Sequence, residues 1–392
     1  MELTQPTQAI HADDDLNTTS DVAPPLHVST TFRYADDPKE LVPVADADIS
    51  TTEAHVYSRH TAPTSTRLET ILAPLLKAPC LTYASGLAAL HAAYVYLNPR
   101  RVSIGDGYHG THGVLEIQQR LCGTRMLPLH CPASDLQPGD VIHLETPLNP
   151  TGKAYNIAEY ADKAHSRGAI LLVDSTFGPP GLQDPFEWGA DMVMHSGTKY
   201  LGGHSDMLCG VLATKENKWL AGLRKDRMFL GSVMGNMESW LGVRSLRTLD
   251  LRIKRQSENA SRLVQWLHSC KNSDSRGKET ELVKTIVEKI QHASLQHKDM
   301  PWLERQMPHG FGPVFAIWAR EERMARELPS LLTLFHHATS LGGVESLIEW
   351  RSMSDPTVDS RVLRVSVGVE DWEDLKADLI RGFQDLLKEP EA

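Results

Sequence analysis

The chain has 392 residues, of which 41% are hydrophobic and 23% charged, the composition of an ordinary globular protein. Its 50 acidic residues outnumber its 40 basic ones, for a net charge of −10, and no block of Lys or Arg stands out, which argues against a nucleic-acid partner. Five cysteines without a C-x-x-C pair argue against a disulfide framework and a zinc site. No run approaches about 18 apolar residues, and residues 1–15 lack the features of a signal peptide, so we expect a cytoplasmic protein without a membrane partner.

The length predicts more than one folding unit. Residues 1–55 have weak periodicity and many Asp, Thr and Pro residues, which predicts an extended N-terminal arm rather than a helix. We expect a large domain over residues 56–250 and a small C-terminal domain over residues 251–392.

Helical and strand-like segments alternate within the predicted large domain. The Ala- and Leu-rich segment 86–97 predicts a helix, and three short apolar runs predict strands buried on both faces of a parallel sheet: residues 102–104, 141–144 and 169–173. Such alternation is typical of a doubly wound α/β domain, so functional residues should gather at the carboxyl ends of the strands.

The C-terminal part has the pattern of a smaller α/β domain. Residues 217–267 read mainly as helix, and the polar segment 272–299 predicts an exposed excursion. Residues 314–318 and 363–367 alternate like strands, and the chain ends in an acidic amphipathic helix.

Two polar side chains follow apolar runs of the predicted sheet. Asp174 comes directly after residues 169–173, and Lys199 ends the sequence Ser-Gly-Thr-Lys that follows a second run, residues 191–195. A carboxylate at the end of a buried strand is costly unless a positive group meets it. Lys199 could lie opposite Asp174, although a capped helix start with a surface lysine is the alternative for this fragment alone.

Pyridoxal phosphate (PLP) accounts for both residues. This cofactor needs an amine for its aldehyde and an anion beside its pyridine nitrogen. Lys199 would carry the aldehyde as a Schiff base and later move protons, with a pKa lowered by burial, while Asp174 would keep the nitrogen protonated. The backbone N–H groups of Ser85, Gly86 and Leu87, at the start of the predicted helix, would hold the phosphate. Hydroxyls of Ser196 and Thr198 would add to this site; for Ser85 alone, a plain N-cap is the simpler interpretation.

The run S-G-T-K-Y-L-G-G-H-S-D over residues 196–206 resembles the lysine motif of the Cys/Met-metabolism PLP enzymes, the trans-sulfuration family of cystathionine γ-synthases and of γ- and β-lyases. Further motifs follow in the family's order over nearly the whole chain: Tyr57-Ser58-Arg59, Ser85-Gly86, residues 145–150, Asp174-Ser175-Thr176-Phe177, residues 340–343 and residues 364–368. The resemblance implies the type I PLP-dependent transferase fold, similar to aspartate aminotransferase, with a large parallel-sheet cofactor domain and a small C-terminal domain. It also implies an amino-acid substrate and self-association into a dimer or tetramer with shared active sites.

The resemblance assigns roles residue by residue. Tyr57 and Arg59 would reach the phosphate of the neighbouring subunit's cofactor, for which a guanidinium is well suited. Tyr108 would stack on the pyridine ring and assist proton transfer, and Asn149 would bond the cofactor's 3′-oxygen and contact the substrate. Thr176 would belong to the cofactor site with Asp174. Arg364 would bind the substrate α-carboxylate with Ser340 nearby; an exposed strand arginine in a surface salt bridge is the alternative.

Several positions depart from the family's pattern around the expected substrate pocket. Ala62 replaces the usual Asn, and His109, Gly110, His112 and Gly113 make an unusual loop after Tyr108. Thr339 precedes Ser340 at a position associated with specificity. The spacing G-x-G-x-x-G over residues 105–110 is a weak dinucleotide signal, because no acidic residue ends a second strand about 20 positions on. His109 and His112 have no third ligand close in sequence, so we expect no metal.

The leading hypothesis is γ-replacement on an activated homoserine ester, in sulfur amino-acid metabolism or a related pathway. The alternatives are γ- or β-elimination from cystathionine or a related thioether, and a PLP-binding regulatory protein with little turnover. One site geometry supports several PLP outcomes, so the residues alone leave these open.

Overall fold

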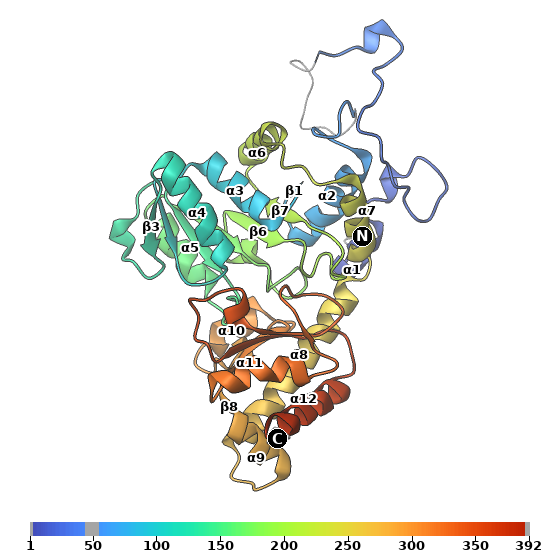
Figure 1. Ribbon diagram of the computed structural model, residues 1–392. Helices are drawn as coiled ribbons and strands as arrows, with labels where there is room; N and C mark the ends of the chain where they lie inside the picture. The colour runs from blue at the N-terminus through green and yellow to red at the C-terminus, as the bar shows by residue number, and fades with distance from the viewer. Residues whose placement is uncertain (1–2, 44–54, 389–392) are drawn as a thin grey trace.

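The computed structural model describes residues 3–43 and 55–388, and it contains two β-sheets (Figure 1). The larger sheet has seven strands in the order β1-β7-β6-β5-β4-β2-β3. Their bounds are β1 (Cys80–Tyr83), β2 (Arg101–Ile104), β3 (Arg125–Pro128), β4 (Val141–Glu145), β5 (Ile170–Asp174), β6 (Met192–Ser196) and β7 (Gly210–Ala213). Only β7 runs antiparallel to its neighbours, so the expected parallel sheet carries one reversed strand.

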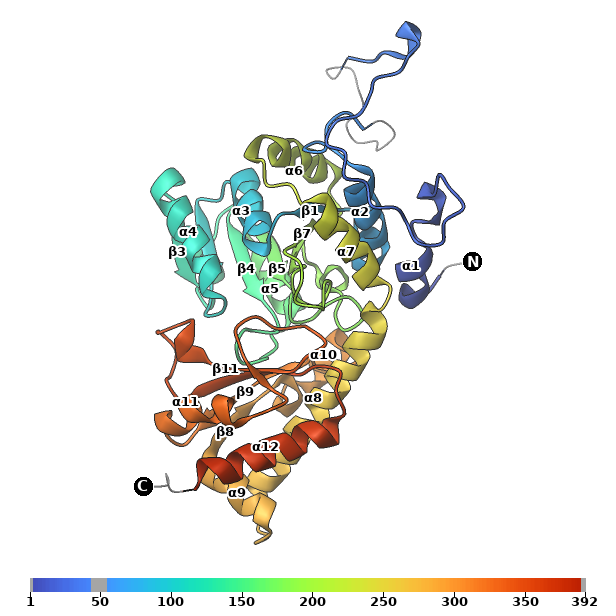
Figure 2. The ribbon, with the colours of Figure 1, turned by 45° about the vertical axis from the view of Figure 1, so that its right-hand side comes forward.

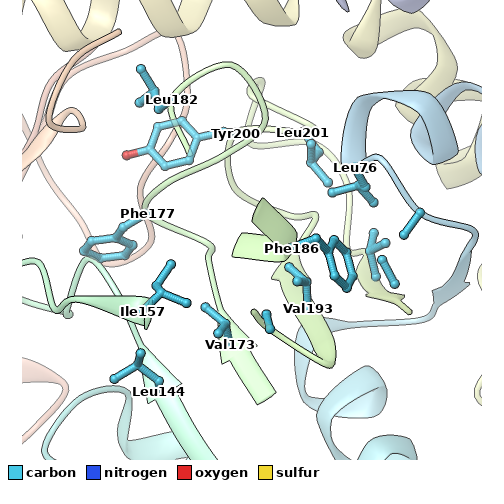
Figure 3. Packing of buried hydrophobic residues seen from close by; sticks show 14 of the residues in the cluster. Leu76, Leu144, Ile157, Val173, Phe177, Leu182, Phe186, Val193, Tyr200 and Leu201 are labelled. Atoms are coloured by element: carbon cyan, nitrogen blue, oxygen red, sulfur yellow. The ribbon is translucent and has the colours of Figure 1, made fainter. Parts of the chain in front are cut away.

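Helices cover both faces of this sheet, which explains why its inner strands are mainly apolar and buried, whereas the edge strand β3 is largely exposed. They are α2 (Pro63–Leu76), α3 (Gly86–Leu97), α4 (His109–Cys122), α5 (Ile157–His165), α6 (Asn217–Leu230) and α7 (Asn236–Leu246). Along β5, Leu171 and Val173 pack into one hydrophobic cluster and Leu172 into another. Figure 3 shows part of the first cluster, where Val173 lies close to Leu144 and Ile157. Successive side chains of the strand therefore enter cores on opposite faces.

The second sheet has five strands in the order β10-β11-β12-β9-β8. These are β8 (Val287–Gln291), β9 (Val314–Ala319), β10 (His336–His337), β11 (Leu347–Trp350) and β12 (Val362–Ser366). The helices of this part are α8 (Leu249–Asn272), α9 (Lys278–Ile286), α10 (Met300–Gln306), α11 (Glu322–Leu331) and α12 (Trp372–Leu386). Figure 2 shows this layer below the larger sheet, with the long helix α8 running from one to the other.

The predicted helix 86–97 is confirmed as α3, and the predicted strands agree with β2, β4, β5, β9 and β12 within about a residue at each end. The exposed excursion predicted for residues 272–299 is wrong. This segment forms α9 and β8, and Val283, Ile286 and Val287 are buried in the core of the C-terminal part. These three apolar residues attach the segment to the core. The high proportion of charged residues around them led the sequence analysis to predict an exposed segment.

The N-terminal arm also contains a helix that the sequence did not predict, α1 (Gln5–His11). Its Ala9 is buried, and the following Asp13 accepts hydrogen bonds from Arg67 at 2.6 Å and from Arg247 at 2.9 Å. These bonds hold the arm against α2 and the segment after α7. Residues 1–2 and 44–54 of the predicted arm lie outside the described residues.

The larger sheet lies within residues 56–250 and the smaller within residues 251–392, but the exact domain division stays a prediction. In the part of the chain that the structure describes, no helix is long and apolar enough to cross a membrane.

Candidate active site

A cavity of about 430 Å³ lies between the larger sheet and the C-terminal part. Three of its lining residues end neighbouring strands at their carboxyl ends: Glu145 on β4, Asp174 on β5 and Ser196 on β6. This is where a doubly wound sheet is expected to bind ligands. The other lining residues used below are Ser85, Gly86, Leu87, Tyr108, His109, Asn149, Thr176, Thr198, Lys199, Thr339, Ser340, Arg351 and Arg364.

Lys199 lies in the turn after β6, and its Nζ donates a hydrogen bond to Ser340 Oγ at 2.7 Å. Burial, together with the nearby charge of Arg364, lowers the pKa of Lys199 to about 8, although Glu349 acts in the opposite direction. A substantial fraction of this amine is therefore neutral near pH 7–8, as imine exchange with an aldehyde and proton abstraction require.

Among the described residues, no basic side chain pairs with Asp174. Its Oδ1 accepts hydrogen bonds from the backbone N–H of Thr176 at 2.9 Å and from the Thr176 hydroxyl at 2.5 Å, and no described residue donates to Oδ2. Burial raises the pKa of Asp174 despite these two bonds. A protonated pyridine nitrogen next to Oδ2 would supply the missing positive charge, so this residue fits the PLP ring.

The amino end of α3 can hold a phosphate. Ser85 Oγ caps the helix by accepting the N–H of Ala88 at 3.1 Å, so the N-cap interpretation of this residue is confirmed. A side chain at Gly86 would approach the Cβ and Oγ of Ser196 to 3.0 Å, which shows how closely the helix end meets β6. The Thr198 hydroxyl is already bonded to the backbone of Cys209, at 3.0 and 3.3 Å. Backbone N–H groups and Ser196 are therefore the stronger phosphate contacts.

Glu145 organises one wall of the cavity, a role that the sequence analysis did not assign. Its Oε2 accepts the backbone N–H of Tyr108 at 2.8 Å, and its Oε1 accepts that of Asn149 at 2.7 Å. Burial and the neighbouring Asp174 raise the pKa of Glu145 to about 8. The carboxyl group thus fixes the two segments that carry Tyr108 and Asn149, the residues predicted to contact the cofactor.

Arg364 is buried, so the exposed surface arginine considered as its alternative is wrong. Its Nη2 donates to the carbonyl oxygen of Ser340 at 2.7 Å and lies 2.6 Å from Glu349 Oε2, and its Nη1 donates to Asn149 Oδ1 at 3.1 Å. Burial lowers the pKa of Arg364 to about 10, which keeps it charged near neutral pH. A fixed guanidinium beside Lys199 and Ser340 can bind the α-carboxylate of an amino acid.

Two predicted residues lie apart from this cavity. Tyr57 and Arg59 are exposed, the guanidinium of Arg59 lies 5.4 Å from the centre of the Tyr57 ring, and its Nη1 donates to the carbonyl oxygen of Met228 at 3.3 Å. Their place outside the chain's own cavity agrees with a role in a neighbouring subunit, which stays a prediction. Of the unusual loop residues, His109 lines the cavity, whereas His112 lines a separate small cavity with His143.

Comparison with known proteins gives the same class of protein. The family model of the Cys/Met metabolism PLP-dependent enzymes matches residues 6–384, and the chain belongs to this family. It is 30% identical to cystathionine γ-synthase of Escherichia coli strain K12 over 386 residues, covering 93% of each chain. It is 33% identical to cystathionine γ-lyase of Dictyostelium discoideum over 404 residues, covering 95% of this chain and 96% of that one.

Among solved structures, the fold matches that of CalE6, a methionine γ-lyase from Micromonospora echinospora. The TM-score is 0.84 at 31% identity, with 97% of this chain and 99% of that chain covered. The predicted type I PLP fold is therefore confirmed, and the chain is a PLP-dependent enzyme of the trans-sulfuration type. Because its relatives include both synthases and lyases, the family leaves the particular reaction open.

Proposed function

We propose that this enzyme catalyses γ-replacement on an O-acyl homoserine, exchanging the acyl group at Cγ for a nucleophile. The observation that carries the proposal is the composition of the cavity wall. Glu145 and Asp174 are the carboxylates that line the cavity among the described residues, and both belong to the cofactor side. Thr339, beside Ser340, is uncharged. Cystathionine carries a second ammonium group at its far end, and this wall offers no free carboxylate to receive it, whereas an ester needs none.

The chain's own residues supply the steps that this reaction needs. PLP, when bound, supplies an electron sink for the substrate's Cα–H bond, with Asp174 beside its ring nitrogen. Arg364 holds the substrate α-carboxylate, which aims the Cα–H bond at Lys199. Lys199, with its pKa near 8, takes the Cα proton, and Ser340 Oγ orients the amine before transfer. Tyr108 lines the cavity, with its backbone N–H bonded to Glu145, and would stack on the ring and assist proton transfer.

Product analysis tests the proposal directly. The holoenzyme is offered O-acetyl-homoserine, O-succinyl-homoserine, cystathionine, cysteine and methionine separately, with and without a thiol or carbon nucleophile, and the products are identified by mass spectrometry. We expect a coupled product only when an ester and a nucleophile are both present. Pyruvate and homocysteine from cystathionine alone indicate β-elimination, and cysteine with 2-oxobutyrate indicates γ-elimination; either result without coupling contradicts the proposal.

γ-Elimination is the second candidate, favoured by the 33% identity to the Dictyostelium γ-lyase. A regulatory protein with little turnover would instead change its visible spectrum on adding an amino acid and release no product. A shared dimeric or tetrameric site and a cytoplasmic location are further parts of the proposal.

A further inference from the structure

Arg351 is a second buried arginine in the wall of the active-site cavity. It lies in the 3₁₀ turn Arg351–Met353, directly after β11, and is 2% exposed. It lines the cavity together with Tyr108 and Arg364. The family resemblance gives this residue no role, and the reaction steps above do not use it.

The hydrogen-bond donors of Arg351 are only partly used. Its Nη1 donates to Glu349 Oε2 at 2.8 Å. Its Nη2 lies 3.9 Å from Asp355 Oδ2, which is too long for a hydrogen bond, and its Nε has no partner among the described residues. A guanidinium withdrawn from water with unused donors is costly unless an anion reaches it.

The carboxylates nearby leave part of the hydrogen-bonding capacity of Arg351 unused. Glu349 Oε2 is shared, because it lies 2.6 Å from Arg364 Nη2 as well as 2.8 Å from Arg351 Nη1. Asp355 accepts the backbone N–H and the hydroxyl of Thr357, at 3.0 and 2.6 Å. Two buried carboxylates, Glu349 and Asp355, face the two guanidinium groups, but Arg351 keeps an Nε without a hydrogen bond in the wall of a cavity large enough for a ligand.

The position of Arg351 distinguishes it from Arg364. Arg364 contacts Asn149 and Ser340, beside Lys199, where the α-carboxylate is proposed to bind. Arg351 comes from the turn after β11, whereas Arg364 lies on β12, and both line the cavity together with Tyr108. An amino acid held by Arg364 at one end can extend its side chain toward this second cation.

We infer that Arg351 is a specificity-determining residue that binds an anionic group, a carboxylate or a phosphate, at the far end of the substrate's side chain. The inference rests on the proposed γ-replacement and deepens it. The activated homoserine ester is then one with a negative charge, either a succinyl ester or, in place of an acyl ester, a phosphate ester, and the neutral acetyl ester is disfavoured.

Binding of amino acids that lack a leaving group tests this without requiring turnover. Isothermal titration calorimetry on the holoenzyme compares L-α-aminoadipate, its phosphonate analogue and L-norleucine, which have similar length and differ in the terminal group. A charge-assisted contact should make the better anion bind about tenfold or more tightly than norleucine. Both anions stand where a homoserine ester carries its phosphorus or acyl carbon, so tighter binding of the phosphonate indicates a phosphate ester as donor. The carboxylate of a succinyl ester lies three atoms further out, and the comparison of succinyl with acetyl ester in turnover tests it.

Three variants assign the preference to the residue. The preference is the ratio of the dissociation constant of norleucine to that of the anionic amino acid. In Arg351→Gln this ratio should fall to about one. In Arg351→Lys, which keeps the charge without the planar guanidinium group, the ratio should be intermediate. Arg323→Gln removes an exposed arginine that pairs with Glu327 outside the cavity, and should leave the preference unchanged. Anion and norleucine binding equally to the wild type, or an undiminished preference in Arg351→Gln, overturns the inference. If Arg351→Gln does not fold, the wild-type comparison and Arg351→Lys still decide.

The outcomes separate this inference from the proposed function. A preference that depends on Arg351, without coupled product from any ester, refutes γ-replacement and leaves the anion site standing. Coupled product with equal use of the acetyl and succinyl esters, and no preference in titration, refutes the anion site alone.

Discussion

Lys199 is the residue whose chemistry depends most directly on burial. The cavity wall and the charge of Arg364 lower its pKa from 10.5 to about 8, so the ammonium form persists only below that pH. Reaction with the aldehyde of PLP needs the neutral amine, because only that form has a free electron pair. We therefore expect the rate at which cofactor-free protein captures PLP to rise with pH and to level off above about pH 8. Visible absorbance after mixing measures this rate, and Lys199→Ala should show no capture; a plateau reached only near pH 10 would contradict the lowered pKa.

Asp174 has the complementary task of keeping a negative charge where the ring nitrogen is proposed to lie. Asp174→Asn keeps an oxygen that can accept the bonds from Thr176, so the local fold should survive while the charge is lost. Turnover should fall by about 100-fold or more, the scale of losing one electrostatic contact to the reacting groups. Steady-state kinetics measure this loss. The matched control is Asp191→Asn. Asp191 lies at the opposite end of β6, where it bonds His165, so this variant should keep near-normal turnover. Equal turnover in the two variants would show that Asp174 has no part in the mechanism.

At the scale of elements, strand patterns located the cofactor side of the cavity, and the family motifs added Asn149, Ser340 and Arg364 on the substrate side, which all line the cavity. Asp174 and Lys199 could be found because each follows an apolar run, and parallel strands bring their carboxyl ends to one edge. Glu349 meets Arg364 because β11 pairs with β12 in a register that places the two residues opposite each other. Lys199 meets Ser340 across 141 residues of chain. Such contacts form between segments that are far apart in the sequence, and the local pattern of apolar residues does not predict them. For this reason the sequence analysis assigned no role to Glu349 or Arg351.

The loop between β2 and α4 shows how an element positions a side chain. Gly107 has φ +141°, and a Cβ there would collide with the Glu145 carboxylate that holds Tyr108. Gly107→Ala should therefore destabilise the protein and lower kcat/KM. Gly113→Ala, inside α4 with no atom within 4 Å of the added Cβ, should instead stabilise it by up to about 1 kcal/mol. Thermal unfolding and kinetics of the two variants measure these opposite effects. A Gly107→Ala enzyme with normal activity would show that the hydrogen bond from the Tyr108 N–H to Glu145 is dispensable.

At the scale of the whole molecule, Tyr57 and Arg59 are exposed and lie outside the chain's own cavity, so we expect each active site to be completed by a neighbouring subunit. Arg59→Ala and Lys199→Ala should each be inactive alone. When the two variants are unfolded together and reassembled at random, half of the dimers are mixed, and each mixed dimer has one site with both residues intact. About a quarter of the wild-type activity should then return. Activity measured after mixing and after separate refolding decides the matter: no recovery in a mixture that light scattering shows to be dimeric, or a fully active monomer, would place Arg59 outside the site.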